Sequence, residues 1–296
     1  MVILISGGTG LIGTKLIALL NSAGHEVRNL STQKKENNLN YYWNPLKNEI
    51  DSKAVIGVDA IIHLAGASII SHKWTEARKK VIVDSRVKGA LLLAQACKQE
   101  NQKIQHYITA SGIGYYGNGE DKLLTELDDA GKSFAAQVCQ KWETSALAFN
   151  TIANQTSIIR IGIVLSSEGG FWAEMKKLAK FKILSPLGSG RQYISWIHIT
   201  DLCKIFKAII ENKIPSGTYN AVSSEPLSNK VLTKAIIKAY RSPSWLPNVP
   251  SFLLKIVLGE RADELLNGQN ASNAKLLKNG FKFEYEHLHK AIENIK

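Results

Sequence analysis

The stretch GGTGLIG, residues 7–13, decides the fold together with the segments on either side of it. VILIS at 2–6 is a short apolar run rich in β-branched residues, which is typical of a buried parallel strand. LIGTKLIALLNSAG at 11–24 has the apolar spacing of an amphipathic helix, and Gly24 stands where a helix would end. The order of strand, glycine-rich turn and helix predicts the first unit of a Rossmann-type fold.

Strand and helix patterns alternate along the rest of the first 165 residues. Short apolar segments typical of strands stand at 25–31, 59–66, 105–112 and 156–165, and helical spacing fills 75–99 and 133–150. Strands that alternate with helices of this length predict an α/β fold, with a doubly wound parallel sheet and helices on both faces.

After residue 165 the pattern loosens around glycine-rich turns, and no linker separates two independent domains. We therefore expect a Rossmann-type domain and a smaller, partly interleaved C-terminal lobe. The domain would contain residues 1–165 and about 191–222, and the lobe about 166–190 and 223–296.

Composition narrows the class of protein. The 296 residues are 45% hydrophobic and 21% charged, without an apolar run long enough for a membrane helix and without a signal-peptide pattern, so we expect a cytoplasmic protein. The three cysteines lie far apart, which argues against a disulfide framework or a metal site. The net charge of +12 is spread along the chain, which disfavours nucleic-acid binding and suits a phosphate-bearing ligand.

The glycine spacing indicates what the first turn binds. Gly7, Gly10 and Gly13 form G-x-x-G-x-x-G, in which bare backbone can approach a pyrophosphate at the positive end of the following helix. The pattern predicts a dinucleotide cradle, and a tight turn without a ligand is the alternative. The predicted cradle also contains Thr9, Leu11 and Ile12.

The end of the second strand indicates which dinucleotide is preferred. An Asp or Glu at this place binds the ribose hydroxyls of NAD, but here the sequence is LSTQKK at 30–35, without an acid. Ser31, Thr32 and Lys34 would accept a 2′-phosphate that a carboxylate would repel. We predict NADP(H) in preference to NAD(H); the alternative is an ordinary polar loop.

Further motifs resemble the extended short-chain dehydrogenase/reductase superfamily. They are HLAG at 63–66, ASGIGYYG at 110–117, SWIHITDL at 195–202 and TYNAVSSEPLS at 218–228. WTEARKKVIVDSR at 74–86, RIGIVLSSEGG at 160–170, PLGSGRQYISWIH at 186–198 and ELLNGQ at 264–269 are similar to one atypical branch, the nucleoside-diphosphate-sugar epimerase-like proteins. The resemblance implies a cofactor domain with a C-terminal substrate lobe, and it leaves a homodimer as one option. The implied cofactor contacts include His63, Leu64, Ala65 and Gly66.

The sequence departs from the superfamily at its central pair. Active members place a Tyr and, four residues later, a Lys on one helix face, where the Lys lowers the pKa of the Tyr. In VCQKWE at 138–143 the corresponding residues are Cys139 and Glu143, and Lys141 lies on a different face. A glutamate raises the pKa of a neighbouring acid. Cys139 is therefore either a packed core residue or a thiol that transfers protons.

Other residues offer replacement acid/base groups. Ser111, Tyr115 and Tyr116 follow a predicted strand, at the sheet edge where open α/β folds place ligands. Tyr116 could supply a proton with Ser111 as its partner, or it could pack against the sheet.

Three further side chains have two interpretations each. Arg86 either reaches the cofactor or forms a surface salt bridge, and Arg160, in an apolar strand, requires a carboxylate or a ligand phosphate. Arg191 either binds an anionic substrate or is only a surface residue of the glycine-rich turn. It stands about three residues before the position at which true nucleotide-sugar epimerases tend to have an arginine, and Ile194 occupies that position here. His198 is expected to be a core histidine.

Two functions follow. The first is an NADP(H)-dependent oxidoreductase or epimerase with atypical acid/base residues and an unknown small-molecule substrate. The second is a non-catalytic NADP(H)-binding sensor or regulatory protein. Turnover of a carbonyl or alcohol substrate would separate the two.

Overall fold

The computed structural model describes residues 1–33, 39–243 and 246–296. These residues form two compact units, and each unit draws on three stretches of the chain. Unit 1 contains Met1–Ser111, Val138–Arg160 and Cys203–Tyr219, whereas unit 2 contains Gly112–Gln137, Ile161–Leu202 and Asn220–Lys296.

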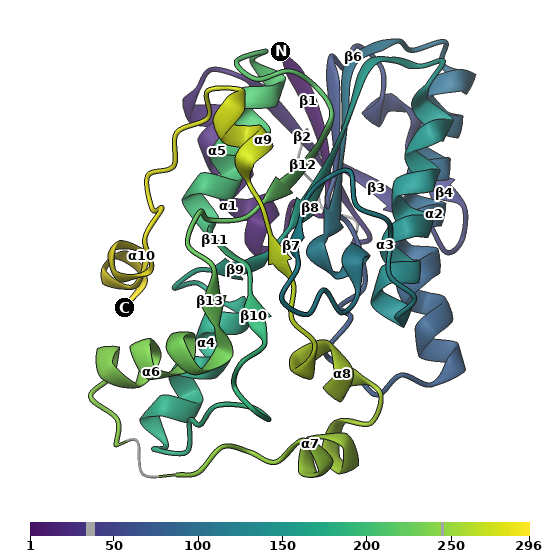
Figure 1. Cartoon of the computed structure of the whole chain (residues 1–296). Helices are drawn as coiled ribbons and strands as arrows, with labels where there is room; N and C mark the ends of the chain where they lie inside the picture. Colours follow the sequence, from purple (N-terminus) through teal and green to yellow (C-terminus); the bar gives the residue numbers. More distant parts are fainter. Residues whose placement is uncertain (34–38, 244–245) are drawn as a thin grey trace. The chain divides into compact units, whose positions relative to one another are not determined.

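Unit 1 is built on an eight-stranded sheet with the order β12-β8-β6-β5-β1-β2-β3-β4 (Figure 1). Its strands are β1 (Val2–Ser6), β2 (Glu26–Ser31), β3 (Asn40–Asn44), β4 (Glu49–Ile50), β5 (Ala60–His63), β6 (Ile104–Gly112), β8 (Ala153–Ile161) and β12 (Thr218–Ala221). Its helices are α1 (Leu11–Ser22) and α2 (Glu76–Gln99), with the greater part of α3 (Phe134–Ser145) and of α5 (Ile199–Ile210), and the short 3-10 turns η1 (Ser52–Ala54) and η3 (Ala146–Phe149).

The central strands are parallel, and β1 and β5 are almost wholly apolar. In the register, Ile5 of β1 stands opposite Asn29 of β2 on one side and Ile62 of β5 on the other. The pairs β5–β6 and β2–β3 are also parallel, whereas β4 returns antiparallel to β3. Side chains on both faces of these strands are buried, as expected for a parallel sheet covered by helices.

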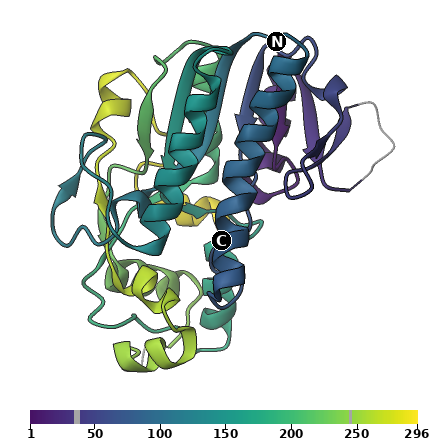
Figure 2. The same ribbon diagram turned by 90° about the vertical axis from the view of Figure 1, so that its right-hand side faces the viewer.

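Helices cover both faces of the sheet. Helices α2 and α3 lie side by side on one face (Figure 2), and α1 lies on the other (Figure 1). Leu4 of β1 packs in one cluster with Leu93 and Cys97 of α2, and its neighbours Ile3 and Ile5 point the opposite way because side chains alternate along a strand. The predicted doubly wound α/β fold is confirmed.

Unit 2 contains short strand pairs and helices around its own core. The pairs are β9 (Ile163–Leu165) with β11 (Trp196–His198), β10 (Tyr193–Ile194) with β13 (Leu227–Ser228), and β7 (Leu123–Leu124) with β14 (Asn270–Ala271). The helices are η2 (Ile113–Tyr116), α4 (Gly170–Lys180), α6 (Asn229–Ala239), α7 (Ser251–Leu258), α8 (Arg261–Leu266), α9 (Ala274–Lys278) and α10 (Leu288–Ile295). Trp172, Trp196 and Ile236 are buried in an apolar cluster of this unit.

The unit boundaries differ from the predicted domain limits. Residues 112–137, 161–165, 191–202 and 220–222, which were expected in the Rossmann-type domain, lie in unit 2. The boundary falls at the carboxyl ends of β6 and β8, where the chain leaves the sheet. In the described ranges, no helix is both long enough and apolar enough to cross a membrane.

Candidate functional site

The predicted cradle corresponds to the glycine turn between β1 and α1. Gly7 has a φ of +80°, and a Cβ there would lie 2.8 Å from the Ala65 nitrogen. A Cβ on Gly13 would lie 2.3 Å from the Gly7 oxygen, so the packing of the turn itself requires both glycines. Gly10 differs, because an added Cβ would meet only the Gly7 oxygen, at 3.3 Å. Gly10 caps α1 without a side-chain hydrogen bond, so backbone N–H groups of the first turn are left for a ligand.

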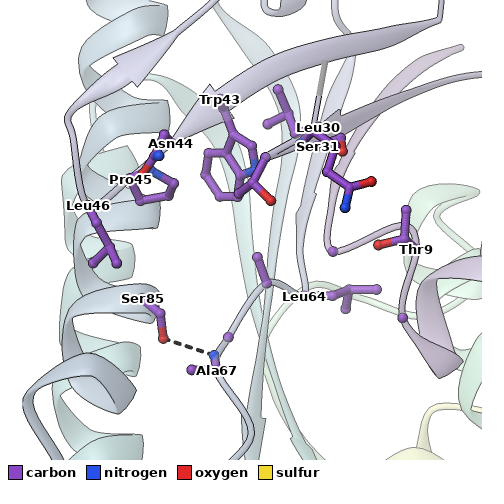
Figure 3. Close-up of a pocket in the computed structure, with 16 residues that line it drawn as sticks. Thr9, Leu30, Ser31, Trp43, Asn44, Pro45, Leu46, Leu64, Ala67 and Ser85 are labelled. Carbon is purple, nitrogen blue, oxygen red and sulfur yellow. Dashed lines mark hydrogen bonds between the residues drawn. The ribbon is translucent and has the colours of Figure 1, made fainter. Parts of the chain in front are cut away.

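A pocket of about 550 Å³ opens beside this turn, entirely within unit 1 (Figure 3). Four loops at the carboxyl ends of neighbouring strands and one helix line it. The lining residues are Gly7, Thr9, Gly10, Leu30, Ser31, Thr32, Gln33, Trp43, Asn44, Pro45, Leu46, Leu64, Ala65, Gly66, Ala67 and Ser85. None of these carries a carboxylate.

The polar end of β2 faces the pocket as predicted. Ser31 is buried, and its Oγ accepts a hydrogen bond of 3.1 Å from the Gln33 nitrogen, whereas Thr32 is exposed. Lys34, the third predicted contact, lies outside the described residues. Leu11 and Ile12 belong to the first turn of α1 and do not line the pocket.

The loop after β5 rests on a buried neutral histidine. His63 is fully buried, and burial lowers its pKa to about 4. Its Nε2 lies 3.1 Å from the Arg86 carbonyl oxygen, and because a carbonyl only accepts, Nε2 carries the proton and Nδ1 accepts from the Ser6 hydroxyl at 2.6 Å. His63 thus supports the loop from below, while Leu64, Ala65 and Gly66 line the pocket. Ser85 Oγ accepts from the Ala67 nitrogen at 2.9 Å (Figure 3).

Arg86 lies behind this loop and is not a surface residue. Its side chain is only 7% exposed, and its Nη1 donates to the carbonyl oxygens of Ala67 at 3.0 Å and Ile82 at 2.9 Å. The guanidinium lies 4.9 Å from the ring centre of Trp142. The surface salt bridge considered for Arg86 is therefore wrong, because the group is buried and pairs with no carboxylate of the described chain.

Glu143 has a partner that the sequence left open. Arg160 donates through Nε to Glu143 Oε1 at 3.0 Å and through Nη2 to Oε2 at 2.9 Å, and Ser111 Oγ donates to Oε1 at 2.7 Å. Of the two partners considered for Arg160, a carboxylate or a ligand phosphate, the structure shows the carboxylate. The hydroxyl hydrogen of Ser111, at the end of β6, is thus used in a hydrogen bond to Glu143.

Cys139 stands one helical turn before Glu143 and is 5% exposed. It lies close enough to Arg86 for a thiolate there to raise the pKa of the guanidinium. Lys141 is exposed, which confirms that it lies on a different face of α3.

The remaining predicted residues belong to unit 2. Tyr116 is buried and its hydroxyl donates to Asn220 Oδ1 at 2.7 Å, while Tyr115 packs edge-on against it. For Tyr116, the structure thus shows the packed side chain that was the alternative to a proton donor. Arg191 is exposed, and its backbone nitrogen donates to Ser189 Oγ at 3.2 Å in the glycine-rich turn. His198 is buried against the Tyr285 ring at 3.9 Å, which confirms a core histidine.

The sequence did not predict one wall of the pocket. Trp43, Asn44, Pro45 and Leu46 come from β3 and the turn after it. The signal that could have located them is NYYWN at 40–44, a run of aromatic residues that favour strands.

Comparison with known proteins identifies the family. The pattern of the NAD dependent epimerase/dehydratase family matches residues 3–221, and a domain of unknown function, DUF1731, matches residues 249–295. The chain belongs to this epimerase family. The resemblance to its epimerase-like branch is thereby confirmed.

Several relatives match almost end to end. Epimerase family protein ML0860 of Mycobacterium leprae is 35% identical over 292 residues, which cover 98% of this chain and 94% of that protein. Mouse epimerase family protein SDR39U1 is 31% identical, and the match covers 100% of this chain and 99% of that protein.

Two solved structures with a similar fold differ in how much of their sequence they share with this chain. Human epimerase family protein SDR39U1, solved with NADPH, has a TM-score of 0.90 at 29% identity, and the match covers 100% of this chain and 99% of that chain. UDP-glucuronic acid 4-epimerase from Bacillus cereus, solved with UDP-glucuronic acid and NAD, has a TM-score of 0.77 at 18% identity, covering 100% of this chain and 98% of that chain. The second likeness concerns the fold alone.

Proposed function

We propose that this protein is an NADP(H)-dependent oxidoreductase or epimerase that binds its cofactor in the unit 1 pocket. The observation that carries the proposal is the cradle. An added Cβ on Gly10 would meet a single atom, the Gly7 oxygen at 3.3 Å, and Gly10 faces a pocket whose described lining residues carry no carboxylate. Human SDR39U1, similar over its whole length, was solved with NADPH.

The residues of the pocket fit a dinucleotide. The first turn of α1 would receive the pyrophosphate, and Ser31 and Thr32 would face the adenosine ribose and its 2′-phosphate. The loop of Leu64, Ala65 and Gly66 would complete the wall, with His63 and Arg86 fixing that loop from behind. When bound, a nicotinamide supplies or accepts hydride, and this chain contributes binding, orientation and proton transfer.

A fluorescence titration with NADPH and NADH tests the cofactor. We expect NADPH to bind at least about tenfold more tightly than NADH, since one charge-assisted contact contributes about 1.5–3 kcal/mol. Thr32→Glu should reverse this preference, and Thr151→Glu, an exposed change of the same charge in unit 1, should leave it unchanged. Equal binding of both dinucleotides by the unmodified chain would refute the NADP preference.

A second pair of variants tests the cradle. Gly10 has an ordinary φ of −81°, so Gly10→Ala and Gly10→Val should fold. Binding should weaken with Ala and be lost with Val, as the side chain fills the approach of the pyrophosphate. Unchanged NADPH affinity in a folded Gly10→Val variant would place the cofactor elsewhere.

A non-catalytic NADP(H)-binding regulator is the second candidate. It is supported by the contacts of Glu143, whose carboxylate is fully engaged by Arg160 and Ser111. Consumption of NADPH in a screen of carbonyl compounds supports the enzyme, and tight binding without turnover supports the regulator.

A further inference from the structure

Most of the positive charge of this protein comes from two stretches of unit 2. Residues 175–200 and 226–259 contain ten lysines and arginines and no aspartate or glutamate, and the formal net charge of the whole chain is +12. The two stretches lie together. The Val249 nitrogen donates to the Pro186 oxygen at 2.8 Å, and the Lys176 ammonium lies 5.5 Å from the centre of the Tyr240 ring. Charge that is spread along the sequence is therefore concentrated in the folded unit.

Helix α6 presents a stripe of cations to solvent. Lys230, Lys234 and Lys238 follow one another at intervals of four residues, so they share one face of the helix and span about 12 Å along it. All three side chains are exposed, and α6 itself contains no acidic residue. The opposite face, with Leu232 and Ile236, is buried in the apolar cluster of unit 2. The exposed face of α6 is therefore complementary to an anionic surface.

Helix α7, which follows in the same acid-free stretch, presents apolar side chains to solvent. Its sequence SFLLKIVL has six apolar residues in eight, and none of its residues is buried. Phe252 is 66% exposed and Ile256 is 75% exposed, and Leu253 and Val257 are exposed as well. A single exposed apolar side chain is ordinary, but a whole helix of them marks a surface that contacts another apolar phase or molecule.

One partner satisfies both helices. Figure 1 shows α6 and α7 at the same, lower end of unit 2. A nucleic acid would neutralise the lysines of α6 but leave the side chains of α7 in water. An anionic lipid bilayer offers phosphates at the level of its headgroups and hydrocarbon directly below them. Lysine stems can lie along this boundary while their ammonium groups contact the phosphates.

We propose that α6 and α7 form a docking surface for an anionic lipid bilayer. The lysines of α6 contact headgroup phosphates, and the apolar side chains of α7 enter the boundary between headgroups and acyl chains. Lys255 of α7 is not counted among the lipid contacts, because it pairs with Asp263 at 3.3 Å. The contact is peripheral and reversible, since the eight residues of α7 are too few to span a bilayer. This surface is separate from the cofactor pocket, so the proposal goes beyond the function proposed above.

Co-sedimentation with vesicles tests the surface in the full chain. The probes are vesicles of phosphatidylcholine alone and vesicles of equal parts phosphatidylcholine and anionic phosphatidylglycerol. We expect about a hundredfold stronger binding to the anionic vesicles, at about fivefold for each of the three lysines, and a decline as the salt concentration rises. Equal binding to both kinds of vesicle, or no binding to the anionic vesicles at low salt, would overturn the proposal.

A matched pair of double variants locates the electrostatic part. Lys234→Gln with Lys238→Gln should weaken binding to anionic vesicles about 25-fold. Lys53→Gln with Lys98→Gln makes the same change in net charge at two exposed lysines of unit 1, and it should change binding by less than about twofold. An equal loss in both double variants would show attraction by net charge alone and would reject the stripe on α6.

A second pair locates the apolar part. Ile256→Gln should weaken binding to anionic vesicles about tenfold, because an isoleucine side chain leaves the lipid boundary. Ile56→Gln, at an exposed isoleucine of unit 1, should leave binding unchanged. The substituted side chains are exposed, so the variants should fold, which circular dichroism verifies. Vesicle binding that Ile256→Gln does not weaken would overturn the contact of α7 with lipid.

Double-stranded DNA is the competing probe. At the same salt concentration it should bind more weakly than the anionic vesicles. Tighter DNA binding that is lost in Lys234→Gln with Lys238→Gln would assign the lysines to a nucleic acid and overturn the proposal. NADPH affinity should equal that of the unmodified chain in every variant, because α6 and α7 do not line the cofactor pocket. The docking surface and the cofactor function are thus tested by separate measurements.

Discussion

The buried cluster of Glu143, Arg160 and Ser111 gives a stability prediction with a definite size. Glu143→Gln removes the negative charge that faces Arg160, whose side chain is only 5% exposed. The amide of Gln can accept through one oxygen, but its NH₂ group would face the donors of Arg160 or Ser111. Removal of one partner from a buried ion pair costs about 3–5 kcal/mol, because the other charge stays buried without compensation.

Chemical denaturation measures this cost as a change in the free energy of unfolding. Glu174→Gln is the matched control, since Glu174 pairs with Lys177 at 2.8 Å but both side chains are more than 60% exposed, at 63% and 64%. That exposed pair should contribute less than about 1 kcal/mol. Glu143→Gln with Arg160→Met should recover most of the loss, because the unpaired cation is removed as well. A cost for Glu143→Gln no larger than the control, or no recovery in the double variant, would refute the buried ion pair.

Three further predictions concern single groups. The folded-state pKa of His63, about 4, is below its ordinary value of 6.5, so the unfolded chain binds a proton first as the pH falls. The free energy of unfolding should therefore fall by up to about 3 kcal/mol between pH 6.5 and pH 4. Urea denaturation at both pH values measures this loss, which should be smaller in His63→Gln. Tyr116→Phe should cost about 1–3 kcal/mol by leaving Asn220 Oδ1 without its donor, with NADPH affinity unchanged; a stability equal to that of the unmodified chain would contradict the buried hydrogen bond. Ser111→Ala should lower any turnover that a metabolite screen finds while NADPH titration gives an affinity within about twofold, and full activity would exclude Ser111 from the reaction.

The regular part of the fold could be predicted because its sequence signals are local. The first strand was predicted at its observed bounds, and the helix expected at 75–99 is α2, Glu76–Gln99. Both elements show their burial in the periodicity of a few consecutive residues. Strand β3 gave a weaker signal, because only Trp43 of its five residues is buried and the strand has no clean alternation.

The contacts that define the site could be predicted only in part, because they join distant residues. The glycine turn is local, so its position and tight packing could be predicted from spacing alone. The partner of Arg160 was expected to be a carboxylate, but nothing in the sequence indicates which one, since Glu143 stands 17 residues away on α3. Arg86 lies 53 positions before Cys139, and no periodicity relates a helix behind one loop to a second helix of the same layer.

The contacts at positions 139 and 143 bear on why this chain lacks the Tyr and Lys of the superfamily. Simple loss of catalysis predicts that their positions become ordinary core, with apolar side chains and no charge. In this protein, position 143 instead holds a carboxylate that is neutralised by Arg160 and hydrogen-bonded to Ser111, and position 139 holds a buried thiol. Buried charges are expensive, so a chain that had only to fold would gain stability by replacing them with apolar groups. The buried pair of Glu143 and Arg160 is therefore kept although an apolar pair would cost less, which the double variant Glu143→Gln with Arg160→Met measures directly.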